Sequence, residues 1–300
     1  NVSESIFPLP YIAGPSADTS PPLLKYLWNT GCLTDDGEAK LLLAETIAMQ
    51  ESIRLRSPYR TPTAENPVIT FLGTGAAMPG KYRNVSSTLV DFGDSAYLLD
   101  CGEATYGQLM RRFAPEELAS IMKRLNAVLI SHLHADHQLG LPAFLQTQGG
   151  KRLVIIAPKR YQLFLEELQE CVQLEGTFDL YDSETMEADQ GYSHTVASAI
   201  GMERVSVIPA IHCPHSYGFV LTHPAGIKIS FSGDTRPCPA LAEAGRESDI
   251  LIHEASFCDA LQAEAIEKRH STLSEAIGIG KSMGAHFTLL NHISQRYAKT

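Results

Sequence analysis

Four apolar runs in this chain are each followed at once by histidine or aspartate. They are "NAVLIS" before "HLHADH", "VSVIPAI" before His212, "KISFS" before Gly233 and Asp234, and "HFTLLN" before His292. Short runs rich in Val, Ile and Phe predict buried β-strands. Ionisable side chains are costly directly behind buried strands unless they are paired or bind a metal. We therefore expect a fold whose strand ends bring these groups to one edge.

The other segments alternate between strand-like and helix-like patterns. Strands are expected at 68–73, 86–92, 96–100, 127–131, 152–157, 205–211, 217–222, 227–232, 249–253 and 286–291. Helices are expected at 105–113 and 116–125, from Gln138 onward, and at 161–174, 239–245, 259–268 and 272–284. Strand clusters separated by helices, in two halves, predict an α/β fold of two mixed sheets packed face to face with helices outside.

The first 66 residues differ from the rest. Residues 1–22 are rich in Pro and Ser and read as a linker, residues 38–56 are mostly strong helix formers, and three prolines break the chain at 57–67. We expect a linker and helical segment over 1–66 and a catalytic domain over 67–300. The opening "NVSESIFPLP" has no initiator Met and predicts a piece of something longer.

Composition excludes some classes of partner and location. The formal net charge is -10 over 300 residues, so the chain is not a polycation that would coat nucleic acid by bulk attraction. Its six cysteines are scattered without a CxxC pair, which predicts reduced thiols in an intracellular protein. No apolar run approaches the ~20 residues that span a bilayer.

The segment "HLHADH" has the residue types of a metal site. In an extended loop His132 and His134 point to one side, whereas Asp136 and His137 are adjacent and diverge, so the group can serve two metals. Imidazole with carboxylate suits zinc, with manganese or iron as substitutes.

Two metals need about three further ligands, and His212, Asp234 and His292 stand at similar strand ends. An isolated histidine behind a strand is more often structural, but three such residues together with HxHxDH are hard to assign to chance. A carboxylate at Asp234 can bridge two cations. His215 lies three residues after His212, and spacing alone leaves open which of the two is the ligand.

HxHxDH, a lone His, Gly-Asp and a final His form the ligand pattern of the metallo-β-lactamase superfamily. Within it the chain resembles the tRNase Z family from about Pro67 to Lys299. The further motifs that carry the resemblance are "PGKYRN" (79–84), "LLDCGEAT" (98–105), "HEAS" (253–256), "HST" (270–272) and "ISQRY" (293–297). Ala104 stands where the family usually has Gly, and Ser256 where it usually has Thr.

The resemblance implies an αβ/βα sandwich holding two zinc ions. It gives His132, His134 and His212 to one ion and Asp136, His137 and His292 to the other, with Asp234 as the bridge. Asp136 would also orient the attacking water, His270 would protonate the leaving oxygen, and Glu254 would orient His270 or raise its pKa. The alternative reading of "HST" is that Ser271 or Thr272 merely caps the following helix.

The same resemblance implies that the "PGKYRN" loop recognises the substrate. Lys81, Arg83 and Asn84 would contact phosphates and bases at the acceptor end, whereas the residues alone favour an ordinary solvated loop. Arg296 meets either a phosphate or a carboxylate, and the sequence does not decide between them.

The implied activity is removal of the 3′ trailer from precursor tRNA by phosphodiester hydrolysis after the discriminator base, leaving a 3′-hydroxyl. The alternatives are another phosphodiesterase or nuclease of the same fold, and a non-catalytic tRNA-binding half. Short members of the family insert a basic clamping arm between the lone His and Gly-Asp, but only residues 213–233, 21 in all, lie there. The chain thus resembles the C-terminal half of the long form, whose N-terminal half would be a partner and whose members work in the nucleus, the mitochondrion or both.

Overall fold

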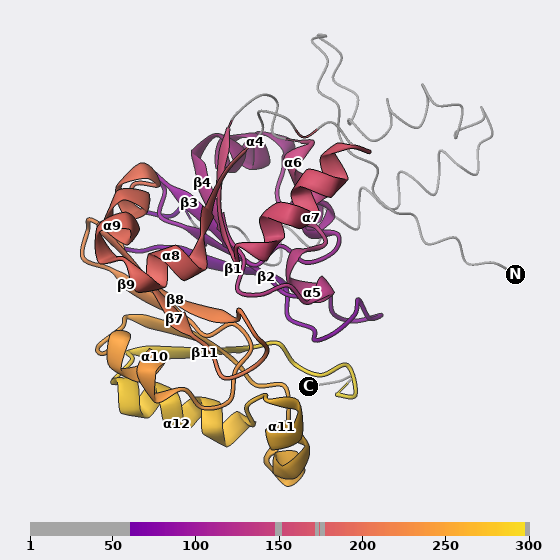
Figure 1. Ribbon diagram of the computed structural model, residues 1–300, viewed down its shortest axis with the longest axis vertical. Helices are drawn as coiled ribbons and strands as arrows, with labels where there is room; N and C mark the ends of the chain where they lie inside the picture. The colour runs from indigo at the N-terminus through magenta and orange to yellow at the C-terminus, as the bar shows by residue number, and fades with distance from the viewer. Residues whose placement is uncertain (1–60, 148–151, 172–173, 175–177, 298–300) are drawn as a thin grey trace, which may run out of the picture.

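A computed structural model describes residues 61–147, 152–171, 174 and 178–297 (Figure 1). The linker expected at 1–22 and the helix expected at 38–56 lie outside the described residues. Two β-sheets form the centre, and helices cover their outer faces. The predicted α/β sandwich of two mixed sheets is therefore confirmed.

The first sheet has six strands in sequence order. They are β1 (Val68–Gly73), β2 (Ser87–Asp91), β3 (Ala96–Leu99), β4 (Leu125–Leu129), β5 (Leu153–Ala157) and β6 (Phe178–Asp182). The β1–β2 and β2–β3 pairs are antiparallel, and the strands from β3 to β6 run parallel.

The second sheet has five strands in the order β11-β10-β9-β8-β7. They are β7 (Arg204–Pro209), β8 (Tyr217–Thr222), β9 (Lys228–Phe231), β10 (Ile250–Glu254) and β11 (Phe287–Asn291). Strands β9, β10 and β11 are parallel, and the antiparallel β8 gives β7 the same direction as β9.

Helices form the outer layers. Over the first sheet lie α3 (Thr105–Arg112), α4 (Pro115–Arg124), the short α5 (Ala135–Gln138) and α6 (Leu141–Leu145), and α7 (Arg160–Gln169). Over the second sheet lie α10 (Pro239–Ala244) and α12 (Leu273–Met283), preceded by a 3-10 turn (Asp259–Leu261) and α11 (Gln262–Lys268). Helices α8 (Ser183–Ala188) and α9 (Gln190–Ala199) contact β7.

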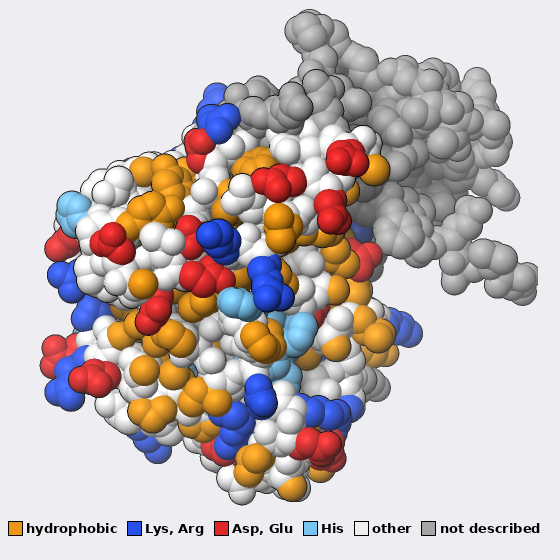
Figure 2. All heavy atoms as spheres, viewed as in Figure 1, with side chains coloured by type: hydrophobic (Ala, Val, Ile, Leu, Met, Phe, Trp, Pro, Cys, Tyr) orange, Lys and Arg blue, Asp and Glu red, His pale blue; other side chains and the backbone are white. Residues whose placement is uncertain are grey.

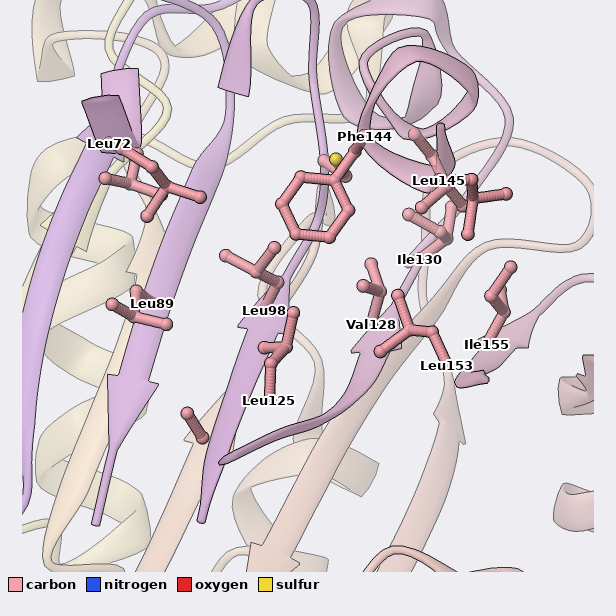
Figure 3. Packing of buried hydrophobic residues seen from close by; sticks show 14 of the residues in the cluster. Leu72, Leu89, Leu98, Leu125, Val128, Ile130, Phe144, Leu145, Leu153 and Ile155 are labelled. Atoms are coloured by element: carbon pink, nitrogen blue, oxygen red, sulfur yellow. The ribbon is translucent and has the colours of Figure 1, made fainter. Parts of the chain in front are cut away.

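Side chains that alternate along each strand of the first sheet divide the buried residues between two hydrophobic cores. Leu98 and Val128 face α6, where Phe144 covers them (Figure 3). Their neighbours Leu99 and Leu129 face the other sheet, because successive side chains of a strand point to opposite faces. The central strands β3 and β4 thus bury both faces, which explains why they read as nearly unbroken apolar runs.

The expected elements differ from the structure in a few places. The helix after "HLHADH" begins at Ala135 rather than Gln138, and the helix expected at 161–174 ends at Gln169. Strand β6 and helices α8 and α9 were not predicted, because their segments are half polar and lack a clear period. The Asp182 and Asp189 side chains do accept backbone N–H groups at the two helix starts, so cap signals were present.

Ala104 occupies a strained position in this frame. It precedes α3 with φ 61°, the left-handed region that favours glycine. We expect Ala104→Gly to raise the free energy of unfolding by about 0.5–1 kcal/mol, because the relieved strain exceeds the added chain entropy. Urea denaturation measures the change. The matched control is Ala119→Gly on exposed α4, which should lower stability by about 1 kcal/mol; a loss in both variants would contradict the prediction.

None of the described helices combines the length and the apolar character needed to cross a bilayer.

Candidate metal centre

The strand ends meet at one edge of the sandwich, as the sequence predicted. His132 follows β4, Asp234 follows β9 and His292 follows β11, while His212 lies three residues beyond β7. These strands are parallel within their sheets, so their carboxyl ends share an edge. The site therefore draws its side chains from both sheets.

Three histidines form one group of facing nitrogen atoms. The Nδ1 atom of His134 lies 2.9 Å from Nε2 of His132 and 3.2 Å from Nε2 of His212. His132 and His212 are buried, whereas His134 is exposed to solvent. The three nitrogen atoms face one another; two belong to the loop after β4 and one belongs to the loop after β7.

A second group lies beside the first. Oδ2 of Asp136 is 3.2 Å from Nε2 of His292 and 3.4 Å from Nε2 of His137, and these two nitrogens are 3.1 Å apart. All three side chains are buried.

Asp234 stands between the two groups. Its Oδ2 atom is 3.3 Å from Nε2 of both His137 and His292, and 3.8 Å from Nε2 of both His132 and His212. Its Oδ1 atom is buried and has no hydrogen-bond partner among the described residues. A buried carboxylate oxygen without a partner is costly unless a cation satisfies it.

Four of these histidines have their other ring nitrogen held by an oxygen atom. The contacts join His132 Nδ1 to Ser131 Oγ (3.0 Å), His137 Nδ1 to Asp100 Oδ2 (2.6 Å), His212 Nδ1 to the Arg269 carbonyl (2.9 Å) and His292 Nδ1 to Ser256 Oγ (2.8 Å). An Nδ1–H that donates outward leaves the Nε2 lone pair facing the centre. That tautomer is the one that binds a metal.

Burial decides the protonation state of three histidines, whereas neighbouring charges decide that of Asp234 and His137. Burial lowers the pKa of the His132, His134 and His212 imidazoles, so they are neutral at pH 7. Burial would raise the pKa of the Asp234 carboxyl, but His292, His137 and His132 around it hold that pKa well below its usual range. Burial alone would likewise lower the pKa of His137, yet Asp234 and Asp100 raise it. The centre thus offers three neutral imidazoles, and its carboxylates attract a positive charge, which at His137 is a proton that a bound metal would replace.

The donor set fits zinc. Imidazole nitrogen and carboxylate oxygen are ligands that zinc prefers, and both groups include histidine. The unpartnered Asp234 Oδ1 and the facing lone pairs have no other explanation among the described residues.

Asp100 makes one of the hydrogen bonds that hold the outer ring nitrogens of the histidines, so a substitution there can test their importance. It has φ 59°, and its Oδ1 and Oδ2 atoms accept from Ser131 N–H (2.8 Å) and His137 Nδ1 (2.6 Å). We expect Asp100→Asn to weaken zinc binding by about 10–100-fold, because the amide holds His137 less firmly in the ligating tautomer. Competition with a chromophoric chelator measures the affinity. Unchanged affinity would contradict the prediction, and exposed Asp94→Asn is the control.

Glu254 and His270 lie directly beside this centre. Nδ1 of His270 is 2.9 Å from Oε1 of Glu254, which also accepts from the Thr235 N–H at 2.7 Å. Oε2 of Glu254 accepts from the Ser256 hydroxyl at 2.7 Å. Burial alone would lower the pKa of His270, but the Glu254 hydrogen bond and charge, with Asp234, raise it to about 9. His270 is therefore protonated at pH 7.

The "HST" segment also caps the following helix, which is the alternative role that the sequence allowed. Thr272 accepts the N–H of Glu275 at the start of α12, and the Glu275 side chain accepts the Thr272 N–H in return. The cap therefore fixes the loop that carries His270.

The "PGKYRN" loop reaches both the centre and the end of the described chain. The Ala77 N–H, just before it, donates to Oδ2 of Asp136 at 2.7 Å. Arg83 donates to the Tyr297 carbonyl at 2.6 Å and Asn84 to the Glu103 carbonyl at 2.8 Å, so both side chains hold the loop in place. The Lys81 ammonium lies 5.4 Å from the centre of the neighbouring Tyr82 ring.

Two further sequence questions have structural answers. Nδ1 of His215 contacts Oε1 of Glu184 at 2.9 Å, away from both groups, so His212 is the histidine brought to the centre. Arg296 pairs with the Glu264 carboxylate at 3.1 Å. Both partners of that pair are more than a third exposed.

Sequence reasoning missed several residues that hold the site. Ser256 contacts Glu254 and His292, and Arg269 donates to the His212 carbonyl at 2.7 Å. Arg236 donates to the His270 carbonyl at 2.6 Å and to the Glu275 carboxylate. Only their proximity in sequence to predicted residues could have drawn attention to them.

Comparison with known proteins agrees with this geometry. The family model described as "Beta-lactamase superfamily domain" matches residues 96–293. The chain belongs to the beta-lactamase superfamily. Within this superfamily it is 38% identical over 297 residues to "Zinc phosphodiesterase ELAC protein 2" of Mus musculus, covering 89% of this chain and 35% of the relative. It is 41% identical over 245 residues to "Ribonuclease Z, mitochondrial" of Drosophila melanogaster, covering 78% and 32%.

Among solved structures of the superfamily, the chain is similar to a long form RNase Z from yeast. The TM-score is 0.73 at 29% identity, and the match covers 81% of this chain and 40% of that one. The resemblance to the tRNase Z family drawn from the motifs is thus confirmed. The chain spans about a third of the length of the curated relatives it matches.

Proposed function

We propose that the chain carries the catalytic centre of a zinc-dependent endoribonuclease that removes the 3′ trailer from precursor tRNA. The observation that carries this proposal is the pair of donor groups on either side of Asp234, with His270 and Glu254 beside them. Relatives named as a zinc phosphodiesterase and as ribonuclease Z support the metal and the RNA substrate.

In this proposal the two groups would hold two zinc ions. His132, His134 and His212 would hold one, Asp136, His137 and His292 would hold the other, and Asp234 would serve both. Bound zinc would polarise the phosphoryl oxygens and lower the pKa of a neighbouring water toward ~7. Asp136 orients the water, and its Oδ2 is itself held by the Ala77 N–H.

His270 completes the reaction as the general acid. With Nδ1–H bonded to Glu254, the proton available for transfer is on Nε2. That proton goes to the 3′ oxygen as its bond to phosphorus breaks, which leaves a 3′-hydroxyl on the discriminator nucleotide and a 5′-phosphate on the trailer. Lys81 and Arg296 are proposed to bind the substrate, while Arg83 and Asn84 position the recognition loop.

The test is end-mapped cleavage of a 3′-trailered precursor tRNA by the zinc-loaded chain. One cut after the discriminator, abolished by Asp136→Ala, supports both the chemistry and the substrate class. If the precursor stays intact while a small chromogenic phosphodiester is hydrolysed, the protein is another phosphodiesterase of this fold. Absence of bound zinc and of both activities would favour a tRNA-binding role.

An N-terminal half with a clamping arm is the proposed partner. Between His212 and Asp234 the chain forms only a short loop, β8, a turn and β9, so the described residues include no arm at that place. Joining such an N-terminal half to this chain should lower the KM for precursor tRNA more than it changes kcat. We further propose a mitochondrial or nuclear location; the name of the Drosophila relative supports the first of these.

A further inference from the structure

Two cations converge on one ring at the border of the candidate centre. The guanidinium of Arg296 lies 5.0 Å from the centre of the Phe257 ring, and the ammonium of Lys268 lies 5.9 Å from it. The Phe257 ring is buried and its centroid is 5.9 Å from that of His270. In Figure 2, Lys and Arg side chains gather beside the histidines, over the region where Figure 1 places α11.

The charges of this cation pair, Lys268 and Arg296, are largely available to a ligand. Lys268 is exposed, and among the described residues it has no carboxylate within salt-bridge distance. Arg296 pairs with Glu264, but exposed pairs of this kind contribute little to stability and exchange readily. In a chain of net charge -10, two cations near one aromatic ring form a local positive patch that attracts an anion.

We infer that Lys268, together with Arg296, binds the phosphate on the 5′ side of the discriminator nucleotide. This inference rests on the proposed function. Because His270 protonates the leaving 3′ oxygen, the side chains around His270 face the nucleotide that keeps that oxygen. The cation pair therefore lies on the tRNA side of the cut, whereas the trailer leaves with the scissile phosphate on the other side.

Two alternative roles for Lys268 are local. It lies in the last turn of α11, where a cation favours the helix dipole, and its contact with Phe257 is itself favourable. Either role would act on stability alone. The phosphate role acts on one particular linkage of the substrate, and this difference makes the two separable.

The experiment pairs Lys268→Met with precursor tRNAs that carry a single neutral methylphosphonate. One substrate has it 5′ of the discriminator nucleotide, and a second has it within the trailer. On the natural precursor we expect Lys268→Met to lower kcat/KM by about three- to five-fold, mainly through KM, as for one exposed phosphate contact. The same loss should appear for the wild type when the 5′ linkage is neutral, and Lys268→Met should add no further loss there.

Controls separate the outcomes. Lys281→Met changes an exposed lysine of α12 and should show no dependence on either linkage. Equal melting temperatures of the Lys268→Met variant and the wild type exclude the purely local roles. If Lys268→Met causes a further loss on the substrate with the neutral 5′ linkage, or if its effect depends on the trailer linkage, this inference is wrong but the proposed function still stands. No cleavage of any precursor by the wild type overturns the proposed function and this inference with it.

Discussion

Asp234→Asn should abolish binding of both zinc ions and lower precursor cleavage by at least about 10³-fold, because loss of a bridging charge removes several kcal/mol of stabilisation. Oδ2 of Asp234 lies close to both donor groups, at 3.3 Å from Nε2 of His137 and 3.8 Å from Nε2 of His132. Asparagine keeps the shape but removes the negative charge. Elemental analysis of zinc after gel filtration gives the stoichiometry.

Zinc should also stabilise the wild type against heat. A ligand that binds only the folded state at 1,000 times its Kd adds about 4 kcal/mol to the free energy of unfolding. A chelator should remove this gain in the wild type and change Asp234→Asn little. The control is exposed Asp94→Asn, which should behave as the wild type. If Asp234→Asn retains two zinc ions per chain, the bridging role is wrong.

The second large effect concerns His270. We expect His270→Ala to lower cleavage of precursor RNA by about 10²–10⁴-fold, the usual contribution of a general acid. A phosphodiester with a nitrophenolate leaving group needs no proton, so the same variant should hydrolyse it at nearly the wild-type rate. Both rates are measured on one zinc-loaded preparation. Equal losses on the two substrates would show that His270 holds the site together and is not the acid.

The pH dependence gives an independent check on His270. The acid must carry its proton, so activity on RNA should fall as pH rises through the pKa of His270, which is raised to about 9. Glu254→Gln removes the carboxylate that raises this pKa, so the alkaline limb should move to lower pH. Exposed His286→Ala is the matched control. An alkaline limb that does not move would exclude Glu254 as the partner that sets this pKa.

The gathering of the candidate ligand side chains at one edge could be predicted because strand ends are easy to recognise in the sequence. Buried strands are apolar on both faces, so His132, Asp234 and His292 stand out at their ends. Parallel direction then places them at one edge, and no knowledge of side-chain packing is needed. The same reasoning could not separate His212 from His215, since loop direction decides between them.

Contacts between distant loops were beyond the sequence. Arg83 and Asn84, which we expect to meet RNA, also donate to the carbonyls of Tyr297 and Glu103, and the sequence did not predict these contacts. Ser256 reads as a small departure from a motif, but its hydroxyl lies between Glu254 and His292. Such roles depend on which carbonyl or ring is nearby in space, and neither periodicity nor spacing encodes that.

The division of donors between the two sheets has a consequence for biosynthesis. Asp136 and His137 leave the ribosome long before His292, which lies 156 residues after Asp136 in the chain. A nascent polypeptide that has made only the first sheet holds an incomplete set of ligands. Under the proposed assignment, the group that His292 completes would bind its ion tightly only after β11 has docked, whereas the group of His132, His134 and His212 is complete earlier in synthesis.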